Sequence, residues 1–213
     1  ILQGYAGAGK TSLIRGMVDH LESESRNILI MAPTGRAAKV IGDKIKREND
    51  NRRATTIHRG IYNFDDIHEV IKGGETEDVT FFFRYALKSD SPSDGSVIIV
   101  DEASMVSDAD NNGEFLRFGS GCLLQDLIRY SRAALKGSET KLVFIGDPAQ
   151  LPPVGMASSP ALDAAYMKGR YSLSTRLVEM KEVVRQRGDG GILAAATAIR
   201  RAGRFGCISA RHN

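Results

Sequence analysis

The segment Gly4–Thr11 reads Gly-Tyr-Ala-Gly-Ala-Gly-Lys-Thr and fits the pattern Gly-x-x-x-x-Gly-Lys-Thr/Ser. Because glycine has no Cβ, the backbone N–H groups of such a loop can turn inward and surround a phosphate. The Lys10 ammonium would lie on the phosphates, and the Thr11 hydroxyl can ligate Mg²⁺. A glycine-rich turn without a ligand is the alternative. The expected nucleotide contacts are Gly4, Gly7, Ala8, Gly9, Lys10, Thr11 and Ser12.

The loop starts almost at the first residue, and the chain has no initiator methionine. We therefore expect these 213 residues to be a piece of a longer protein. No apolar run reaches the roughly 18 residues that a membrane span needs. Cys122 and Cys207 form neither a disulfide framework nor a zinc-binding pair, which favours a reducing compartment. We expect a cytoplasmic protein, associated with the nucleoid if it is bacterial.

The net charge of +3 hides a segregated distribution. Residues 36–59 hold eight Lys/Arg against three acids, and residues 168–211 hold ten against three. Between them, residues 62–114 hold thirteen acids against three Lys/Arg. A mixed solvated surface is the ordinary explanation, but basic blocks beside an acidic one favour a polyanionic partner.

Short apolar runs alternate with helical patterns along the chain, which predicts βαβ units. The expected strands are Ile28–Ala32, Val97–Asp101, Leu142–Gly146 and Arg176–Met180. The expected helices are Lys10–Leu21, Gly35–Arg47, Leu123–Leu135 and Gly190–Arg201. We predict an α/β fold of the P-loop NTPase class, with a central, mostly parallel β-sheet flanked by helices.

Two segments interrupt this alternation. Ile61–Asp94 is acidic and contains the aromatic run Thr80–Tyr85, which as a strand would place Phe81, Phe83 and Tyr85 on one face. Ser107–Gly121 is polar and is expected to be a loop. We predict an ATPase domain over 1–60 and 97–213, with 61–96 inserted into it.

Two further strands end in residues suited to phosphate chemistry. After Val97–Val100, Asp101 could hold Mg²⁺ and Glu102 could activate a water, although a polar turn is the alternative. After Leu142–Gly146, Pro148 makes the turn rigid and displays Gln150, whose amide could sense a γ-phosphate.

Taken in order, six segments resemble the motifs of the first RecA-like motor domain of superfamily 1 helicases, in the RecD and Dda branch (superfamily 1B). Gly4–Thr11 resembles motif I, Ala32–Ala38 motif Ia, and Ala54–Arg59 the Thr-Ile-His element that follows it. Asp101–Val106 resembles motif II, Gly146–Val154 motif III, and Val183–Gln186 motif IV.

The resemblance implies roles for individual residues. The catalytic set is Lys10, Glu102, Gln150 and Arg185, with Arg185 as an arginine finger, and the metal set is Thr11 and Asp101. The DNA-binding set is Pro33, Thr34, Gly35, Arg36, Thr56 and His58. For His58, packing against Tyr62 is an equally good alternative. The 61–96 insertion could form a duplex-splitting pin whose aromatic side chains stack on bases, but packing onto the domain is the favoured interpretation.

The resemblance also implies a function. We expect one motor lobe of an ATP-dependent DNA helicase or translocase that uses ATP and Mg²⁺ and moves 5′→3′ on single-stranded DNA in recombination or repair. Nuclease or repair-complex subunits are the expected partners, and no membrane is involved. We expect the second RecA-like lobe to be absent from this chain, so the fragment alone should be poorly active. An RNA helicase and a non-catalytic nucleotide-dependent interaction domain are the alternatives.

Overall fold

A computed structural model of the protein describes residues 1–5, 7–46, 54–72, 80–111, 113 and 116–180. The helix predicted over Gly190–Arg201 and the Val183–Gln186 segment lie outside the described residues. None of the helices in the described ranges has the length and apolarity needed to cross a membrane.

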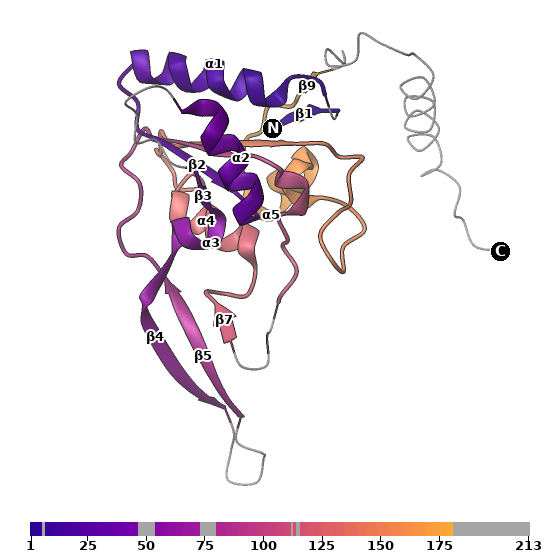
Figure 1. Ribbon diagram of the computed structural model, residues 1–213. Helices are drawn as coiled ribbons and strands as arrows, with labels where there is room; N and C mark the ends of the chain where they lie inside the picture. The colour runs from indigo at the N-terminus through magenta and orange to yellow at the C-terminus, as the bar shows by residue number, and fades with distance from the viewer. Residues whose placement is uncertain (6, 47–53, 73–79, 112, 114–115, 181–213) are drawn as a thin grey trace, which may run out of the picture.

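A six-stranded sheet with the order β3-β2-β6-β8-β1-β9 forms the centre of the body, and all its neighbouring strands are parallel (Figure 1). Its strands are β1 (Leu2–Gly4), β2 (Ile28–Ala32), β3 (Thr55–Thr56), β6 (Val97–Val100), β8 (Lys141–Gly146) and β9 (Val178–Met180). All four residues of β6 are buried, as expected for a central parallel strand covered on both faces.

Helices cover both faces of this sheet. On one face, α1 (Lys10–Ser23) and α2 (Gly35–Ile45) pack with Val97 and Ile99 of β6 in one apolar core. On the other face, Ile98 and Val100 belong to a second core. That core includes residues of α3 (Ile57–Ile61), α4 (Leu123–Ser131) and α5 (Ala164–Tyr171). The alternation along β6 therefore divides two hydrophobic cores, and the predicted RecA-like P-loop α/β fold is confirmed.

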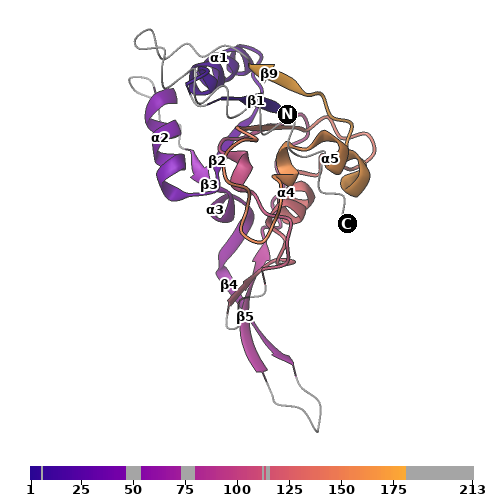
Figure 2. The same ribbon diagram turned by 90° about the vertical axis from the view of Figure 1, so that its right-hand side faces the viewer.

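A second, three-stranded sheet projects from the body (Figures 1 and 2). The strands β4 (Tyr62–Lys72) and β5 (Thr80–Leu87) form an antiparallel hairpin, and β7 (Leu116–Phe118) pairs in parallel with β5. The strand predicted over Phe81–Tyr85 is present. The loop predicted over Ser107–Gly121 was wrong at β7, because its backbone pairs with β5 and the Phe118 ring stacks on Tyr85 at 5.1 Å.

Several element boundaries differ from the predicted ones. The fourth helix ends at Ser131 instead of Leu135, since Arg132 adopts a left-handed conformation (φ 56°) that stops it. The second helix ends at Ile45, α1 continues to Ser23, and β9 starts at Val178. The short elements α3, α5, η1 (Ala103–Met105) and η2 (Pro160–Leu162) were not predicted.

Candidate nucleotide-binding and catalytic site

The glycine-rich loop joins β1 to α1 in a conformation that requires glycine. Gly7 and Gly9 have φ angles of 83° and 85°. A Cβ on Gly4 would lie 3.2 Å from Met180 Cβ and 3.3 Å from Lys10 Cγ, so this position is tightly packed. Gly9 caps α1 without a side-chain hydrogen bond, which leaves the first amides of the helix available to an anion.

Lys10 follows these glycines and folds back over the loop. Its Nζ donates to the carbonyl oxygens of Gly4 at 2.8 Å and Tyr5 at 3.2 Å. These bonds hold the ammonium group at the mouth of the loop, where the charge of a bound phosphate would lie.

Two carboxylates follow the buried strand β6. Asp101 is buried, and Glu102 is half-buried with a left-handed backbone (φ 52°) that is uncommon for a residue other than glycine. Burial raises the pKa of both carboxyl groups, and the charge of Asp101 raises the pKa of Glu102 further. The nearby Lys10 ammonium partly offsets both shifts. A carboxylate with a raised pKa is a stronger base once it is ionised.

Gln150 belongs to the turn after β8 and is tied to the segment that follows the carboxylates. Ser104 Oγ donates to Gln150 Oε1 at 3.3 Å, and the Ser104 carbonyl oxygen accepts from Ser159 Oγ at 2.9 Å. A Cβ on Gly146 would lie 3.1 Å from the Ser104 nitrogen, so β8 ends in close contact with η1. The predicted sensor Gln150 is thus bonded to Ser104, which comes two residues after the predicted base Glu102.

A hollow of about 710 Å³ collects these groups. Its lining includes Lys10, Thr11, Asp101, Glu102 and Gln150, which is the arrangement expected from motifs I, II and III. The other lining residues are Gly7, Gly9, Ser12, Arg15, Thr34, Arg36, Ala37, Val40, Lys44 and Met105.

Arg15 and Lys44 were not predicted from the sequence as lining residues, and Arg36 was predicted only as a DNA contact. Their spacing along the helices was the signal that could have indicated them. Arg15 comes four residues after Thr11 on α1, and Arg36 and Lys44 are eight residues apart on α2, so each pair shares a helix face.

The other predicted nucleic-acid residues have varied surroundings. The side chains of Thr34 and Thr56 act as helix N-caps, accepting from Ala37 N and Arg59 N at 3.2 Å each. His58 lines a separate hollow, with its ring 5.7 Å from Tyr62. Its packing against Tyr62 is therefore present, and Pro33 and Gly35 line neither hollow. Arg185 lies outside the described residues.

The oxygen donors of this site fit Mg²⁺. The Thr11 hydroxyl and the Asp101 carboxylate are hard ligands that line the same hollow. The described ranges contain no group of three His, Cys, Asp or Glu side chains that could hold a metal ion. Mg²⁺ in nucleotide sites usually binds one or two protein oxygens and completes its shell with phosphate and water.

The family model described as "AAA domain" matches residues 1–117, which is more than half of the chain. The chain belongs to this family. It is 27% identical over 199 residues to the ATP-dependent RecD2 DNA helicase of Deinococcus radiodurans (93% of this chain, 21% of the relative). It is 24% identical over 184 residues to the RecBCD enzyme subunit RecD of Buchnera aphidicola (83% and 27%). Together these matches support a first motor domain of the superfamily 1B helicase type.

A further relative is the uncharacterized protein MJ1519 of Methanocaldococcus jannaschii, at 32% identity over 166 residues. This match covers 76% of the chain. The chain spans only 12% to 27% of the length of these three relatives.

Proposed function

We propose that the chain is a motor lobe of an ATP-dependent DNA helicase or translocase, which couples Mg-ATP hydrolysis to movement on single-stranded DNA. The observation that carries the ATPase part is that Lys10, Asp101, Glu102 and Gln150 line one hollow. The name of the RecD2 DNA helicase supports DNA as the track.

Each residue of the hollow has its own role in the proposed reaction. The Lys10 ammonium and the first amides of α1 hold the phosphates. Glu102 orients a water and takes its proton, and Gln150 links the state of the γ-phosphate to η1 through Ser104. Mg²⁺ held by Thr11 and Asp101 would neutralise charge on the phosphate oxygens. Arg185 would stabilise charge on the transferring phosphoryl group.

The nucleic-acid side of the proposal rests on the resemblance. Pro33, Thr34, Gly35, Arg36, Thr56 and His58 are the proposed single-strand contacts. Movement 5′→3′, a role in recombination or repair, an intracellular location and nuclease or repair-complex partners belong to the same proposal. Residues 1–60 and 97–213 would form the ATPase domain, and the hairpin of residues 61–96 its insertion.

The substitution Glu102→Gln tests the catalytic assignment. In the complete protein that carries this chain, it should lower DNA-stimulated ATP hydrolysis by about 100-fold or more, as for loss of a general base. Binding of Mg-ADP should persist, because the phosphate-binding residues are intact. The exposed Glu139 provides the control, and Glu139→Gln should hydrolyse ATP at the wild-type rate. Undiminished hydrolysis in Glu102→Gln would remove Glu102 from the proposed mechanism.

The nucleic-acid assignment has its own test. Hydrolysis is measured with an oligo-dT and with an oligo-U strand of equal length. We expect stimulation by oligo-dT. Stimulation by oligo-U alone would make the protein an RNA helicase, and nucleotide binding without hydrolysis would make it a non-catalytic interaction domain.

A further inference from the structure

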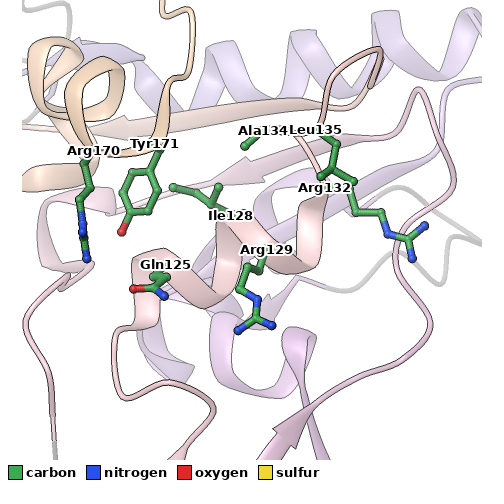
Figure 3. A pocket seen from close by; sticks show the side chains of 8 residues that line it. All are labelled: Gln125, Ile128, Arg129, Arg132, Ala134, Leu135, Arg170 and Tyr171. Atoms are coloured by element: carbon green, nitrogen blue, oxygen red, sulfur yellow. The ribbon is translucent and has the colours of Figure 1, made fainter.

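A second hollow, of about 510 Å³, lies between α4 and α5 (Figure 3). Its lining is Gln125, Ile128, Arg129, Arg132, Ala134, Leu135, Arg170 and Tyr171. None of these residues lines the nucleotide hollow or the hollow beside His58. Its volume lies in the range of pockets that hold a small ligand or a few side chains.

The lining is strongly positive. It contains three arginines and no acidic residue. Arg129 and Arg132 are exposed, and neither has an ion pair among the described residues. In Figure 3, the guanidinium group of Arg129 lies between those of Arg170 on the left and Arg132 on the right, and the hollow's apolar residues also lie between these two outer arginines. Arginine forks of this kind suit carboxylates, which they bind through two parallel hydrogen bonds.

An apolar surface accompanies these charges. Leu135 is 61% exposed, and Ile128, Ala134 and the Tyr171 ring line the same hollow. The Tyr171 hydroxyl donates to the Asp108 carboxylate, and Arg170 Nε lies 3.8 Å from the same carboxylate. Because Asp108 holds both residues, this side of the hollow is preformed.

We propose that this hollow binds an acidic peptide segment of a partner protein, with one large apolar side chain in the hollow and neighbouring carboxylates on Arg129, Arg132 and Arg170. The Gln125 amide could pair with the peptide backbone. A nucleic-acid strand would instead need cations that follow a phosphate track, and its charge would leave the exposed Leu135 unused. Because arginines and apolar side chains line the same hollow, a peptide is the favoured ligand.

The occupant would also touch side chains that are tied to the segment following the proposed catalytic carboxylates. Tyr166, Arg170 and Tyr171 all contact Asp108, which comes six residues after Glu102. A bound peptide would thus rest on α5 and on the side chains that tie α5 to this segment. The binding proposal goes beyond the proposed ATPase and does not depend on it.

To test this, peptides that bind the purified protein are selected from a random peptide-display library. The affinity of the tightest-binding peptide is then measured by fluorescence anisotropy. We expect the selected peptides to combine Asp or Glu with a Leu, Phe or similar side chain. Arg129→Glu with Arg132→Glu should weaken binding of that peptide by about tenfold or more, since charge reversal replaces attraction with repulsion. Leu135→Ser should also weaken it, by about threefold or more.

The exposed Lys136 provides a matched control, because it carries a positive charge next to Leu135 but does not line the hollow. Lys136→Glu should leave peptide binding within about twofold. Enrichment of peptides without acids, or equal binding to the double arginine variant, would overturn the proposal. A second result would also overturn it: the double arginine variant loses binding of a labelled oligo-dT strand, while Leu135→Ser binds both the peptide and oligo-dT as the wild type does. That result would assign the surface to nucleic acid.

Discussion

At the scale of single residues, the balance of charge inside the proposed nucleotide-binding hollow bears on the ligand that it suits. Four cationic side chains, Lys10, Arg15, Arg36 and Lys44, share the lining with two acids, Asp101 and Glu102. The excess of positive charge suits a nucleoside triphosphate, which carries several negative charges at one end. The charge of Lys44 also acts on Asp101: it lowers the pKa of that carboxyl group and so opposes the effect of burial, which raises it.

We predict that Arg15→Ala and Lys44→Ala each weaken Mg-ADP binding by about three- to tenfold, since each removes one attractive charge from the hollow. Isothermal titration calorimetry at low and high salt measures the loss, which should shrink as salt screens the remaining charges. Lys39 on α2 is exposed and lies outside the hollow, so Lys39→Ala is the control. An equal loss in Lys39→Ala would mean that general surface charge, not the hollow, holds the nucleotide.

A second prediction concerns the hydrogen bond between Ser104 and Gln150. Ser104→Ala should cost about 1 kcal/mol of folding stability and reduce the ratio of DNA-stimulated to basal ATP hydrolysis, because Gln150 loses its tie to η1. Ser131 is the matched control, as an equally buried serine whose Oγ donates to the Ile128 carbonyl oxygen at 2.8 Å on α4. Ser131→Ala should lose similar stability but keep the ratio. If both variants keep the ratio, Gln150 does not depend on this bond.

Single residues of the hollow were predictable to different degrees. Lys10, Asp101 and Glu102 stand in fixed patterns at strand ends, so their convergence follows from the parallel sheet. Arg15 and Lys44 stand in no such pattern and enter the hollow only because two helix faces meet there. The caps formed by Thr34 and Thr56 depend on where each helix begins, which sequence locates least accurately.

At the scale of elements, a buried hydrogen bond joins the projecting sheet to the body. Tyr62, the first residue of β4, donates from its hydroxyl to Asp126 Oδ2 on α4 at 2.8 Å. The Ser120 nitrogen donates to the same oxygen at 2.9 Å. Both side chains are almost fully buried, and burial together with the neighbouring carboxylate raises the pKa of Tyr62. The root of the hairpin is therefore fixed by a polar contact as well as by aromatic packing.

We predict that Tyr62→Phe lowers the free energy of unfolding by about 1–3 kcal/mol, because a buried carboxylate loses a donor. Urea unfolding at pH 7 measures the change. Tyr130 is a suitable control, as a buried tyrosine whose hydroxyl has no hydrogen-bond partner within the described residues. Tyr130→Phe should change the free energy of unfolding by less than about 0.5 kcal/mol. Equal losses in the two variants would contradict a special role for Asp126.

The elements that could be predicted are those whose own residues carry the signal. The strand Ile28–Ala32 was predicted to the residue, and Val97–Val100 nearly so, because continuous apolar runs are buried on both faces. The three residues of β7 carry no such run, and they form a strand only because β5 offers an edge. The helix α5 depends on the Asp163 cap, which accepts from two backbone nitrogens, and on Met167 in the core.

At the scale of the whole molecule, His58 lies where the body meets the projecting sheet. Its ring is 5.7 Å from Tyr62 and 5.0 Å from Phe118, so it contacts residues of both β4 and β7. Phe118 in turn lies 5.2 Å from Tyr62 and 5.1 Å from Tyr85. The histidine is thus part of the aromatic contacts that hold the projecting sheet against α3.

This position makes global stability depend on pH. Burial lowers the pKa of His58 below its ordinary value of 6.5, so the unfolded chain takes up a proton at a higher pH than the folded chain. The stabilising contribution of His58 is therefore present above about pH 6.5. It is lost as the pH falls through the lower pKa of the folded state. Asp101 and Glu102, whose pKa values are raised, act in the opposite sense and lose stability as the pH rises.

A comparison of the wild type with His58→Gln separates these effects, since the two carboxyl groups are common to both proteins. We predict that the wild type is the more stable at pH 7.5 and that its advantage shrinks at pH 6.5 and again at pH 5.5. Urea unfolding at the three pH values measures the difference in the free energy of unfolding. A difference that stays constant or grows as the pH falls would mean that the folded state accommodates a charged His58, and that the aromatic contacts do not exclude the proton.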